Sequence, residues 1–194
     1  MRTLIFATNN QHKLDEVQAI VGSDFLLKSL NDIGCYDEIP ETGVTFEENA
    51  SQKSHYIYDR YQADCFADDS GLEIESLNNE PGVYSAIYSG SRDTEDNMQL
   101  VLKKLQNQPN RKARFRTIIS LILDGEEHLF EGFIEGTITN QQSGNKGFGY
   151  DPIFQPNGYS ITFADMTAVE KNKISHRGIA MQNMLKFLQD KHNA

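Results

Sequence analysis

The sequence predicts an α/β fold with a mixed, partly antiparallel β-sheet. A buried strand, a polar turn and an amphipathic helix follow one another near the N-terminus. Further along, the strand-like segments 115–123 and 128–138 flank Asp124-Gly125, a dipeptide typical of hairpin turns. Because helices and strands mix without regular alternation, a plain doubly wound sheet is not expected.

The N-terminal segment supplies the first three predicted elements. Residues 3–7 are expected to form the buried strand, and residues 25–30 a second strand. The helix between them is expected to close at Gly22 and carries apolar residues on one face: Leu14, Val17 and Ile20.

Three further helices follow from capping signals and apolar spacing. Thr45 and Glu48 have the spacing of a capping box, which predicts a helix over 46–61. Asp93 or Thr94 begins the next helix, with four apolar residues directed inward: Met98, Val101, Leu102 and Leu105. Ser175 is expected to cap the last helix, whose apolar side includes Ile179, Met184 and Leu188.

The paired acids Asp68 and Asp69 are the most informative feature of the chain. We expect the strand 65–67 to end at them, a sharp turn to follow, and residues 72–74 to return as a hairpin arm. Adjacent carboxylates repel each other, so a cation usually accompanies them, and on loops this is most often magnesium. A plain hydrogen-bonded turn is the alternative for this Asp-Asp-Ser-Gly run. Glu41 is a weaker metal-ligand candidate in its own loop.

Composition limits the partners and the compartment. The formal net charge of −10 over 194 residues argues against non-specific binding to nucleic acid or an anionic membrane. Cys35 and Cys65 allow a single disulfide, and nothing suggests an oxidising compartment. The apolar run 4–7 is too short for a signal peptide or a membrane span, so a cytoplasmic location is expected.

Basic and polar residues form candidate phosphate sites in two segments. Thr8, Asn10 and Lys13 lie where a strand meets a helix, where backbone N–H groups and the helix dipole attract anions. An ordinary turn with a solvated lysine is equally consistent with this segment. Lys53 and Asn49 share one face of the predicted second helix, and Lys53 is the better ligand candidate.

The segment Gly147-Phe148-Gly149-Tyr150-Asp151-Pro152 is a candidate base-binding loop. Two glycines around an aromatic ring let the backbone approach a flat partner, and a purine could stack on the ring of Phe148. The alternative is a glycine-rich turn whose phenylalanine packs into the core. His176 and Arg177 are placed at the start of the last helix, where basic residues oppose the helix dipole. This unfavourable placement favours a functional role over an ordinary cap.

Seven segments together resemble the inosine triphosphate pyrophosphatase family. They are ATNNQHKLDEV, ETGVTFEENASQKS, ADDSGLEIESLNNEPGVYSA, ARF, GFGYDPIFQP, TFADM and EKNKISHRG. They occur in the family's order between Ala7 and Gly178, so the resemblance covers most of the chain. Any one of these motifs alone would be weak, whereas the ordered set is specific.

The resemblance implies a fold and an activity. It implies one domain over residues 1–194, an elongated mixed sheet with flanking helices in two lobes around a central cleft, and a homodimer. It also implies Mg²⁺-dependent hydrolysis of non-standard purine nucleoside triphosphates (ITP, dITP and XTP) to the monophosphate and pyrophosphate. Such an enzyme would cleanse the nucleotide pool and prevent misincorporation into DNA and RNA.

The resemblance also implies roles for individual residues. Asp69 resembles the family's proton acceptor, and the magnesium ligands would be Glu41 and Asp69, with Asp68 in support. The triphosphate would bind Lys53 and the turn Thr8, Asn9, Asn10, Gln11, His12 and Lys13. Ser70 would touch the substrate, and the base pocket would comprise Phe148, Gly149, Tyr150, Asp151, Lys171, His176 and Arg177.

Some positions depart from the family pattern, and other functions compete with this one. His12 stands where glycine is common, Ile87 where arginine is usual, and residues 143–146 lack the frequent Pro-Arg. A pyrophosphatase of modified pyrimidine nucleotides, as in the septum-inhibition family, and a non-catalytic nucleotide-binding protein are the alternatives. A nucleic-acid binder conflicts with the acidic net charge.

Overall fold

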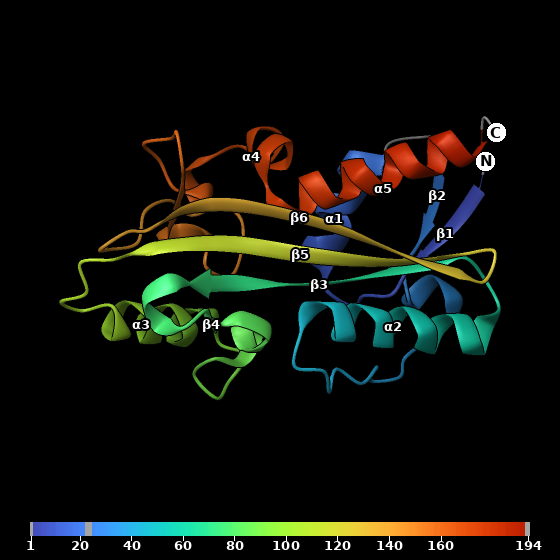
Figure 1. Ribbon diagram of the computed structural model, residues 1–194, viewed down its shortest axis with the longest axis horizontal. Coiled ribbons are helices and arrows are strands. Elements are labelled where there is room, and N and C mark those ends of the chain that lie inside the picture. Colours follow the sequence, from blue (N-terminus) through green and yellow to red (C-terminus); the bar gives the residue numbers. More distant parts are fainter. Residues whose placement is uncertain (1, 22–24, 193–194) are drawn as a thin grey trace. The chain divides into compact units, whose positions relative to one another are not determined.

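A computed structural model describes residues 2–21 and 25–192 of the chain (Figure 1). The strands are β1 (Arg2–Phe6), β2 (Phe25–Lys28), β3 (Cys65–Ile74), β4 (Glu80–Pro81), β5 (Lys112–Leu123), β6 (Glu126–Ile138) and β7 (Phe154–Pro156). The α-helices are α1 (Gln11–Val21), α2 (Phe46–Tyr61), α3 (Thr94–Lys104), α4 (Ala168–Ile174) and α5 (His176–His192).

The strands form a mixed sheet in the order β2-β1-β3-β5-β6-β7, with β4 paired to β3. β1 is parallel to both β2 and β3, whereas β4 is antiparallel to β3 and β7 is antiparallel to β6. Asp124 and Gly125 connect β5 to β6 with φ values of 51° and 86°, as a tight hairpin turn requires. The predicted α/β class, mixed sheet and hairpin are therefore confirmed.

The chain divides into two compact units. Unit 1 comprises the described residues of 1–69, 117–132 and 177–194, and unit 2 comprises Ser70–Arg116 and Phe133–His176. The division agrees with an expectation of two lobes. The elongated outline, the central cleft and the single domain over residues 1–194 stay predictions.

In unit 1, helices cover both faces of the sheet (Figure 1). Alternate residues of a strand point to opposite faces, and β1 shows this directly. Leu4 and Phe6 pack in a cluster with residues of α1 and α5, while Ile5 and Ala7 join a cluster that includes Ile57 of α2. Residues 4–6 of β1 are therefore all apolar, because both faces of the strand are buried there.

The core of unit 2 is built around three phenylalanine rings. The ring centroid of Phe115 lies 4.6 Å from that of Phe154 and 5.9 Å from that of Phe163. Leu72 of β3 and Val101 of α3 belong to the same buried cluster. The inward apolar face predicted for α3 is thus present, and Asp93 caps this helix as expected.

The turn predicted after Asp68 and Asp69 is wrong. Both acids lie inside β3, which continues from Cys65 to Ile74, and the strand antiparallel to it is β4 rather than residues 72–74. Partners distant in sequence bind both carboxylates, so these acids do not need a turn to satisfy them. The N–H of Leu72, within the same strand, donates to Ser85 Oγ at 2.9 Å.

The remaining elements depart from expectation by smaller amounts. β2 ends at Lys28 rather than residue 30, and the closure predicted at Gly22 lies outside the described residues. α2 begins with the predicted capping box, in which Thr45 and Glu48 each bind the other's backbone N–H. Lys171 lies in a separate short helix, α4, which Ser175 ends just before α5 begins.

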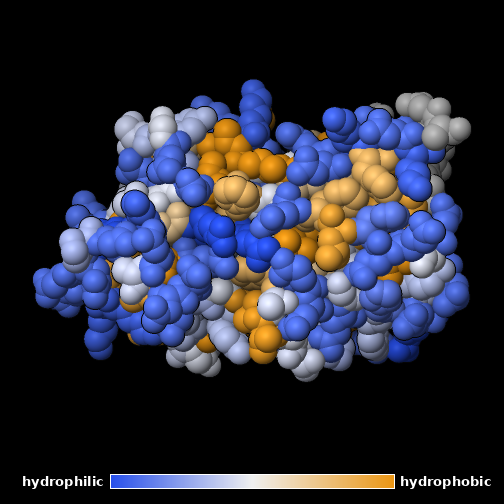
Figure 2. Space-filling view, in the orientation of Figure 1, coloured by the Kyte–Doolittle hydropathy of each residue, from blue (hydrophilic) through white to orange (hydrophobic). Residues whose placement is uncertain are grey.

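The visible surface is mainly hydrophilic, with smaller hydrophobic areas between the polar residues (Figure 2). Large apolar side chains that stay exposed include Leu129 on β6 and Tyr84 in the 3₁₀ helix Gly82–Ile87. Within the residues that the structure describes, no helix is both long enough and apolar enough to cross a membrane.

Candidate active site

Asp68 is enclosed by cations of unit 1. Its Oδ1 accepts from Lys13 Nζ at 3.0 Å, and its Oδ2 accepts from Nε and Nη2 of Arg177, each at 3.2 Å. The backbone carbonyl of Asp68 accepts from Lys53 Nζ at 2.7 Å. Burial alone would raise the pKa of Asp68, but the three cations outweigh it and hold that pKa well below its usual range. The carboxylate is therefore ionised at neutral pH.

The first turns of α1 and α5 position two of these cations. Asn10 Oδ1 accepts from the backbone N–H of Lys13 at 3.2 Å, which caps α1 and fixes Lys13 in its first turn. Arg177 is the second residue of α5, as predicted, and its Nη1 also donates to Glu16 of α1. Burial opposes the charge of Arg177, yet Asp68 and Glu16 raise its pKa. Arg177 therefore links α1 and α5 to the paired acids.

Asp69 has a different environment from its neighbour. Its side chain is only 8% exposed, and its Oδ2 accepts from Asn49 Nδ2 at 3.0 Å. Burial raises the pKa of Asp69 to about 6, although Lys53, Lys13 and the Asn49 hydrogen bond oppose the rise. A carboxyl group with a pKa near neutrality is suited to accept a proton in catalysis.

Lys53 joins the Glu41 loop to the paired acids. Its Nζ donates to Glu41 Oε1 as well as to the carbonyl of Asp68. Burial lowers the pKa of Lys53, but Asp69, Asp68 and Glu41 together raise it above its usual value. Lys53 therefore remains an ammonium ion in a buried position, which suits it to contact phosphate oxygens.

The acids of unit 1 offer hard oxygen ligands. Magnesium takes one or two carboxylates and completes its shell with waters and substrate phosphates. Asp69 and Glu41 fit this donor set, because both carboxylates interact electrostatically with the same ammonium group, that of Lys53. Both oxygens of Asp68 already receive cationic donors. Among the described residues, no three His, Cys, Asp or Glu side chains form a ready metal cluster.

Unit 2 brings together a second group of predicted residues. Asp151 Oδ2 accepts from Lys171 Nζ at 2.6 Å and from the backbone N–H of Phe148 at 2.9 Å. Lys171 Nζ also lies 4.9 Å from the centroid of the Phe148 ring. The buried ion pair thus holds the loop and an ammonium group against one half-buried aromatic ring.

Gly147 makes this loop possible. It has a φ of +72°, and a Cβ built on it would lie 2.0 Å from Asp151 Oδ2. Gly149 also has a positive φ, of +59°, but no atom lies within 4 Å of the Cβ position. The first glycine is therefore required by both conformation and space, and the second by conformation alone.

The other predicted residues of unit 2 have clear contacts. Tyr150 Oη donates to the carbonyl of Ser85 at 2.7 Å, and burial raises the pKa of Tyr150 well above its usual value. The ring of His176 stacks on Phe115 at 4.8 Å with an interplanar angle of 11°. Ser70 is half-buried in β3.

The structure therefore sorts the predicted residues into two groups. Unit 1 brings Lys13, Glu41, Lys53, Asp68 and Arg177 into one network of contacts, and Asp69 interacts electrostatically with Lys13, Lys53 and Glu41. Unit 2 joins Phe148, Asp151 and Lys171 directly. Four residues of the N-terminal turn are half-buried or exposed around the start of α1: Thr8, Asn9, Gln11 and His12.

Two residues of unit 1 were not predicted as site residues. Glu16 pairs with Arg177, and its position three residues after Lys13 on one helix face was an available signal. Asn49 donates to Asp69, and its four-residue spacing from Lys53 indicated the correct face of α2. Spacing along a helix indicates which face a residue occupies, but it does not predict these two contacts, because their partners are remote in sequence.

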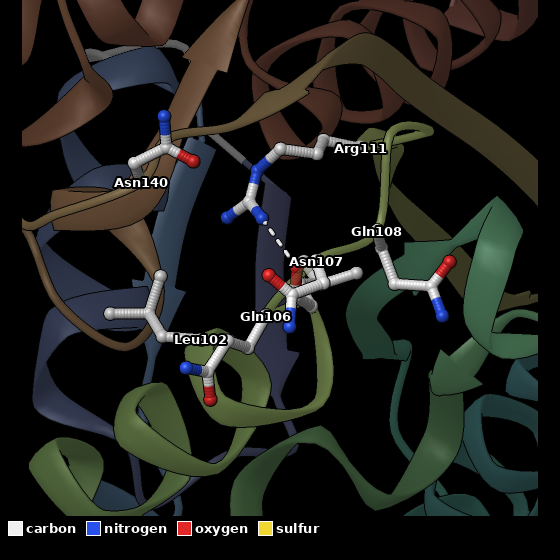
Figure 3. A pocket seen from close by; sticks show the side chains of 7 residues that line it. Leu102, Gln106, Asn107, Gln108, Arg111 and Asn140 are labelled. Carbon is white, nitrogen blue, oxygen red and sulfur yellow. Dashed lines mark hydrogen bonds between the residues drawn. The ribbon is translucent and has the colours of Figure 1, made fainter.

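A cavity of about 360 Å³ in unit 2 involves none of the predicted site residues (Figure 3). It is lined by Leu102, Leu105, Gln106, Asn107, Gln108, Arg111 and Asn140. The guanidinium of Arg111 donates to three backbone carbonyls, those of Leu105, Ile138 and Thr139. These bonds give Arg111 a structural role, since they tie the end of α3 to the end of β6.

Comparison with known proteins decides the family. The model of the Ham1 family matches residues 4–187, which is nearly the whole chain. This chain belongs to the Ham1 family. The matched range includes the residues of both groups described above.

Curated relatives share nearly half of their residues with the chain. The dITP/XTP pyrophosphatase of Flavobacterium psychrophilum is 47% identical, and the alignment covers 96% of this chain and 99% of that protein. The dITP/XTP pyrophosphatase of Porphyromonas gingivalis is also 47% identical, with coverage of 97% and 98%. These relatives confirm the resemblance to pyrophosphatases that the ordered motifs indicated.

Solved structures confirm the Ham1 fold. The Ham1 protein of Staphylococcus aureus superposes with a TM-score of 0.90 at 37% identity, covering 98% of this chain and all of that one. A dITP/XTP pyrophosphatase from Mycobacterium abscessus gives a TM-score of 0.77 at 41% identity, with coverage of 94% and 98%.

Proposed function

We propose that this Ham1 protein hydrolyses dITP, ITP and XTP to the nucleoside monophosphate and pyrophosphate. Near-complete alignment with curated dITP/XTP pyrophosphatases supports this activity. The single structural observation that carries it is the buried pair Asp68 and Asp69, of which one is neutralised by cations and the other has a pKa of about 6. Such a pair suits an enzyme that must hold polyphosphate and also activate water.

Unit 1 would bind the triphosphate. Lys13 in the first turn of α1 is half-buried and Lys53 in α2 is buried, and both lie beside the paired acids. The N-terminal turn from Thr8 to Lys13 would add backbone N–H groups and the positive end of the helix dipole. Together they would neutralise the charge that develops on the departing pyrophosphate.

Asp69 would act as the general base. A water molecule attacks the α-phosphorus, and its proton passes to the carboxylate of Asp69 as the new P–O bond forms. The bond between the α-phosphorus and the bridging oxygen breaks, and pyrophosphate leaves with that electron pair. No covalent intermediate with the protein is required.

Mg²⁺ would be held by Glu41 and Asp69, with Asp68 in support. When bound, this ion would supply charge neutralisation and Lewis-acid polarisation at the phosphates. The ion pairs of Asp68 favour a supporting role for it, because Lys13 and Arg177 already contact its two oxygens.

Unit 2 would recognise a purine base. The Phe148 ring offers a stacking surface, and the ammonium of Lys171 lies over that ring. Lys171 and His176 would donate to the 6-oxo group of hypoxanthine or xanthine, with Gly149, Tyr150 and Asp151 shaping the pocket. Adenine presents a 6-amino donor at the same position, so a buried donor would be left without an acceptor. Ser70 would also contact the substrate.

The wider setting of the activity is part of the proposal. We infer a cytoplasmic homodimer whose residues 1–194 act as a single catalytic domain and which clears non-standard purines from the nucleotide pool. The net charge of −10 supports small-molecule rather than nucleic-acid partners. The ion pairs of Arg177 in unit 1 favour a role for this residue beside Asp68 over a direct contact with the base.

Product analysis tests this function. The protein is incubated with dITP, ITP, XTP, GTP, dATP and a modified pyrimidine triphosphate, with Mg²⁺ or with EDTA, and the products are separated by chromatography. We expect monophosphate and pyrophosphate from dITP, ITP and XTP in Mg²⁺ only. Release of orthophosphate and a diphosphate would contradict attack at the α-phosphorus, and a preference for the pyrimidine would assign the site to another substrate class.

A further inference from the structure

The loop that carries Glu41 is attached to α2 by side chains rather than by a backbone ladder. Consecutive N–H groups of this loop donate to three side chains of α2. The N–H of Thr42 donates to Gln52 Oε1 at 2.9 Å, and that of Gly43 to Asn49 Oδ1 at 2.8 Å. The N–H of Val44 donates to Glu48 Oε2 at 2.7 Å. The loop therefore follows the surface of α2 closely.

Asn49 is the only one of these three α2 residues that is buried, at 4% exposed, and its amide also reaches the paired acids. While Oδ1 accepts from Gly43, Nδ2 donates to Asp69 Oδ2 at 3.0 Å. The first bond orients the amide, so that its nitrogen must face the carboxylate. One side chain thus connects the Glu41 loop with Asp69.

We propose that Asn49 is a positioning residue that fixes the orientation of the Asp69 carboxylate relative to the Glu41 loop. This inference rests on the proposed function of Asp69 as proton acceptor. A carboxylate can rotate about its terminal torsion, which is a soft coordinate. A directed N–H at Oδ2 removes that freedom, and catalysis by a base depends on such orientation.

The surroundings of Gly43 support the same assignment. A Cβ at Gly43 would lie 2.5 Å from the Cβ of Glu48 and 2.8 Å from Asn49 Oδ1. Only glycine lets the loop come close enough for its N–H to reach the amide. The loop is thus built around the hydrogen bond that orients Asn49.

Three variants separate positioning from loop attachment. Asn49→Asp keeps an oxygen for the Gly43 N–H but loses the donor to Asp69, and Asn49→Ala loses both. Gln52→Ala is the matched control, because Gln52 holds the same loop through Thr42. We expect kcat on dITP to fall about 10- to 100-fold in both Asn49 variants, with KM changed by less than about threefold. Gln52→Ala is expected to retain kcat.

Two kinetic results would overturn the proposal. If Asn49→Asp keeps the wild-type kcat, the donated hydrogen bond has no role in orienting the base. If Gln52→Ala loses as much kcat as Asn49→Ala, attachment of the loop explains the effect without any contact to Asp69.

An activity-independent measurement separates this inference from the proposed function. Urea unfolding midpoints are compared for wild type, Asn49→Ala, Asp69→Ala and the double variant. We expect the shifts of the two single variants to be non-additive, because each removes the same contact. Additive shifts would overturn the positioning role. A wild-type protein that cleaves none of the nucleotides yet shows the non-additivity would refute the proposed function and leave the contact established.

Discussion

Asp68 and Asp69 are adjacent in β3, yet their carboxyl pKa values move in opposite directions. Successive side chains of a strand point to opposite faces, so the two neighbours meet different partners. Asp68 contacts Lys13 and Arg177, whereas Asp69 receives a neutral amide from Asn49. The pair therefore divides into one carboxylate that is charged at neutral pH and one carboxyl group that can exchange a proton.

Replacement of Asp69 by asparagine should abolish turnover and stabilise the metal-free protein. The folded pKa of about 6 exceeds the unfolded value of 3.8, so ionised Asp69 destabilises the fold increasingly as pH rises through 6. Near pH 8, Asp69→Asn should raise the free energy of unfolding by roughly 2–3 kcal/mol. Near pH 3.5 the variant and wild type should have similar stability. Urea unfolding in EDTA at both pH values measures this, and unchanged turnover would exclude Asp69 as the base.

Replacement of Asp68 by asparagine should have the opposite effect on stability. The folded pKa of Asp68 lies below its unfolded value, so its contribution is present above about pH 4 and is lost as pH falls further. At pH 7 the variant removes the carboxylate that Lys13 and Arg177 share. This loss should lower the free energy of unfolding by about 3 kcal/mol. Chemical denaturation checks this value, and a variant as stable as wild type would show that the ion pairs are energetically neutral.

Removal of the Phe148 ring should weaken binding of the base. Phe148→Ala is expected to raise KM for ITP at least about fivefold, because stacking on an aromatic ring contributes about 1–3 kcal/mol per base. Tyr159→Ala is a suitable control, since Tyr159 is an exposed aromatic residue of the same unit. Steady-state kinetics of both variants measure the effect. Equal KM values in wild type and Phe148→Ala would exclude base stacking at this ring.

Alanine substitution of the two glycines around Phe148 should have unequal effects. Gly149→Ala should lower the free energy of unfolding by about 1 kcal/mol, because its only penalty is the strain of a positive φ. Gly147→Ala adds a clash with Asp151 Oδ2 and should disturb the ion pair with Lys171. We expect a larger loss of unfolding free energy and a higher KM for ITP in Gly147→Ala. Thermal unfolding and kinetics of the matched pair test this, and equal losses would show that the loop moves to accommodate the methyl group.

Chelation tests the role proposed for the acids as metal ligands. EDTA should abolish pyrophosphate release, and excess Mg²⁺ should restore it. Glu41→Gln should raise the Mg²⁺ concentration needed for half-maximal activity about 10-fold or more, because it removes one of few carboxylate ligands. Full activity in EDTA would remove the metal from the mechanism.

Local signals predicted those elements whose partners are close in sequence. The capping box of Thr45 and Glu48 and the Asp124-Gly125 hairpin both depend on neighbouring residues, and both are present. The turn predicted after Asp69 was wrong. Acids followed by Ser-Gly favour a turn locally, but here residues distant in sequence form the hydrogen bonds of both carboxylates. Lys13 and Arg177 are 55 and 109 residues from Asp68, and no local pattern encodes such contacts.

The same reasoning applies to the site. Motif order indicated the acids, the lysines and the glycine-rich loop, and the structure joins many of them within each unit. The paired cations of Asp68 and the Asn49 amide could not be predicted, since both depend on which strand face each acid occupies.

The beginning of α5 has a chemical role as well as a packing role, because Arg177 lies there. Because its guanidinium binds both Glu16 and Asp68, any deletion that reaches position 177 removes a charge from the proposed active site rather than a dispensable tail. Under the proposed function, shortened versions of this chain should therefore be interpreted as active-site variants once they lose the start of the last helix, whatever their remaining thermal stability.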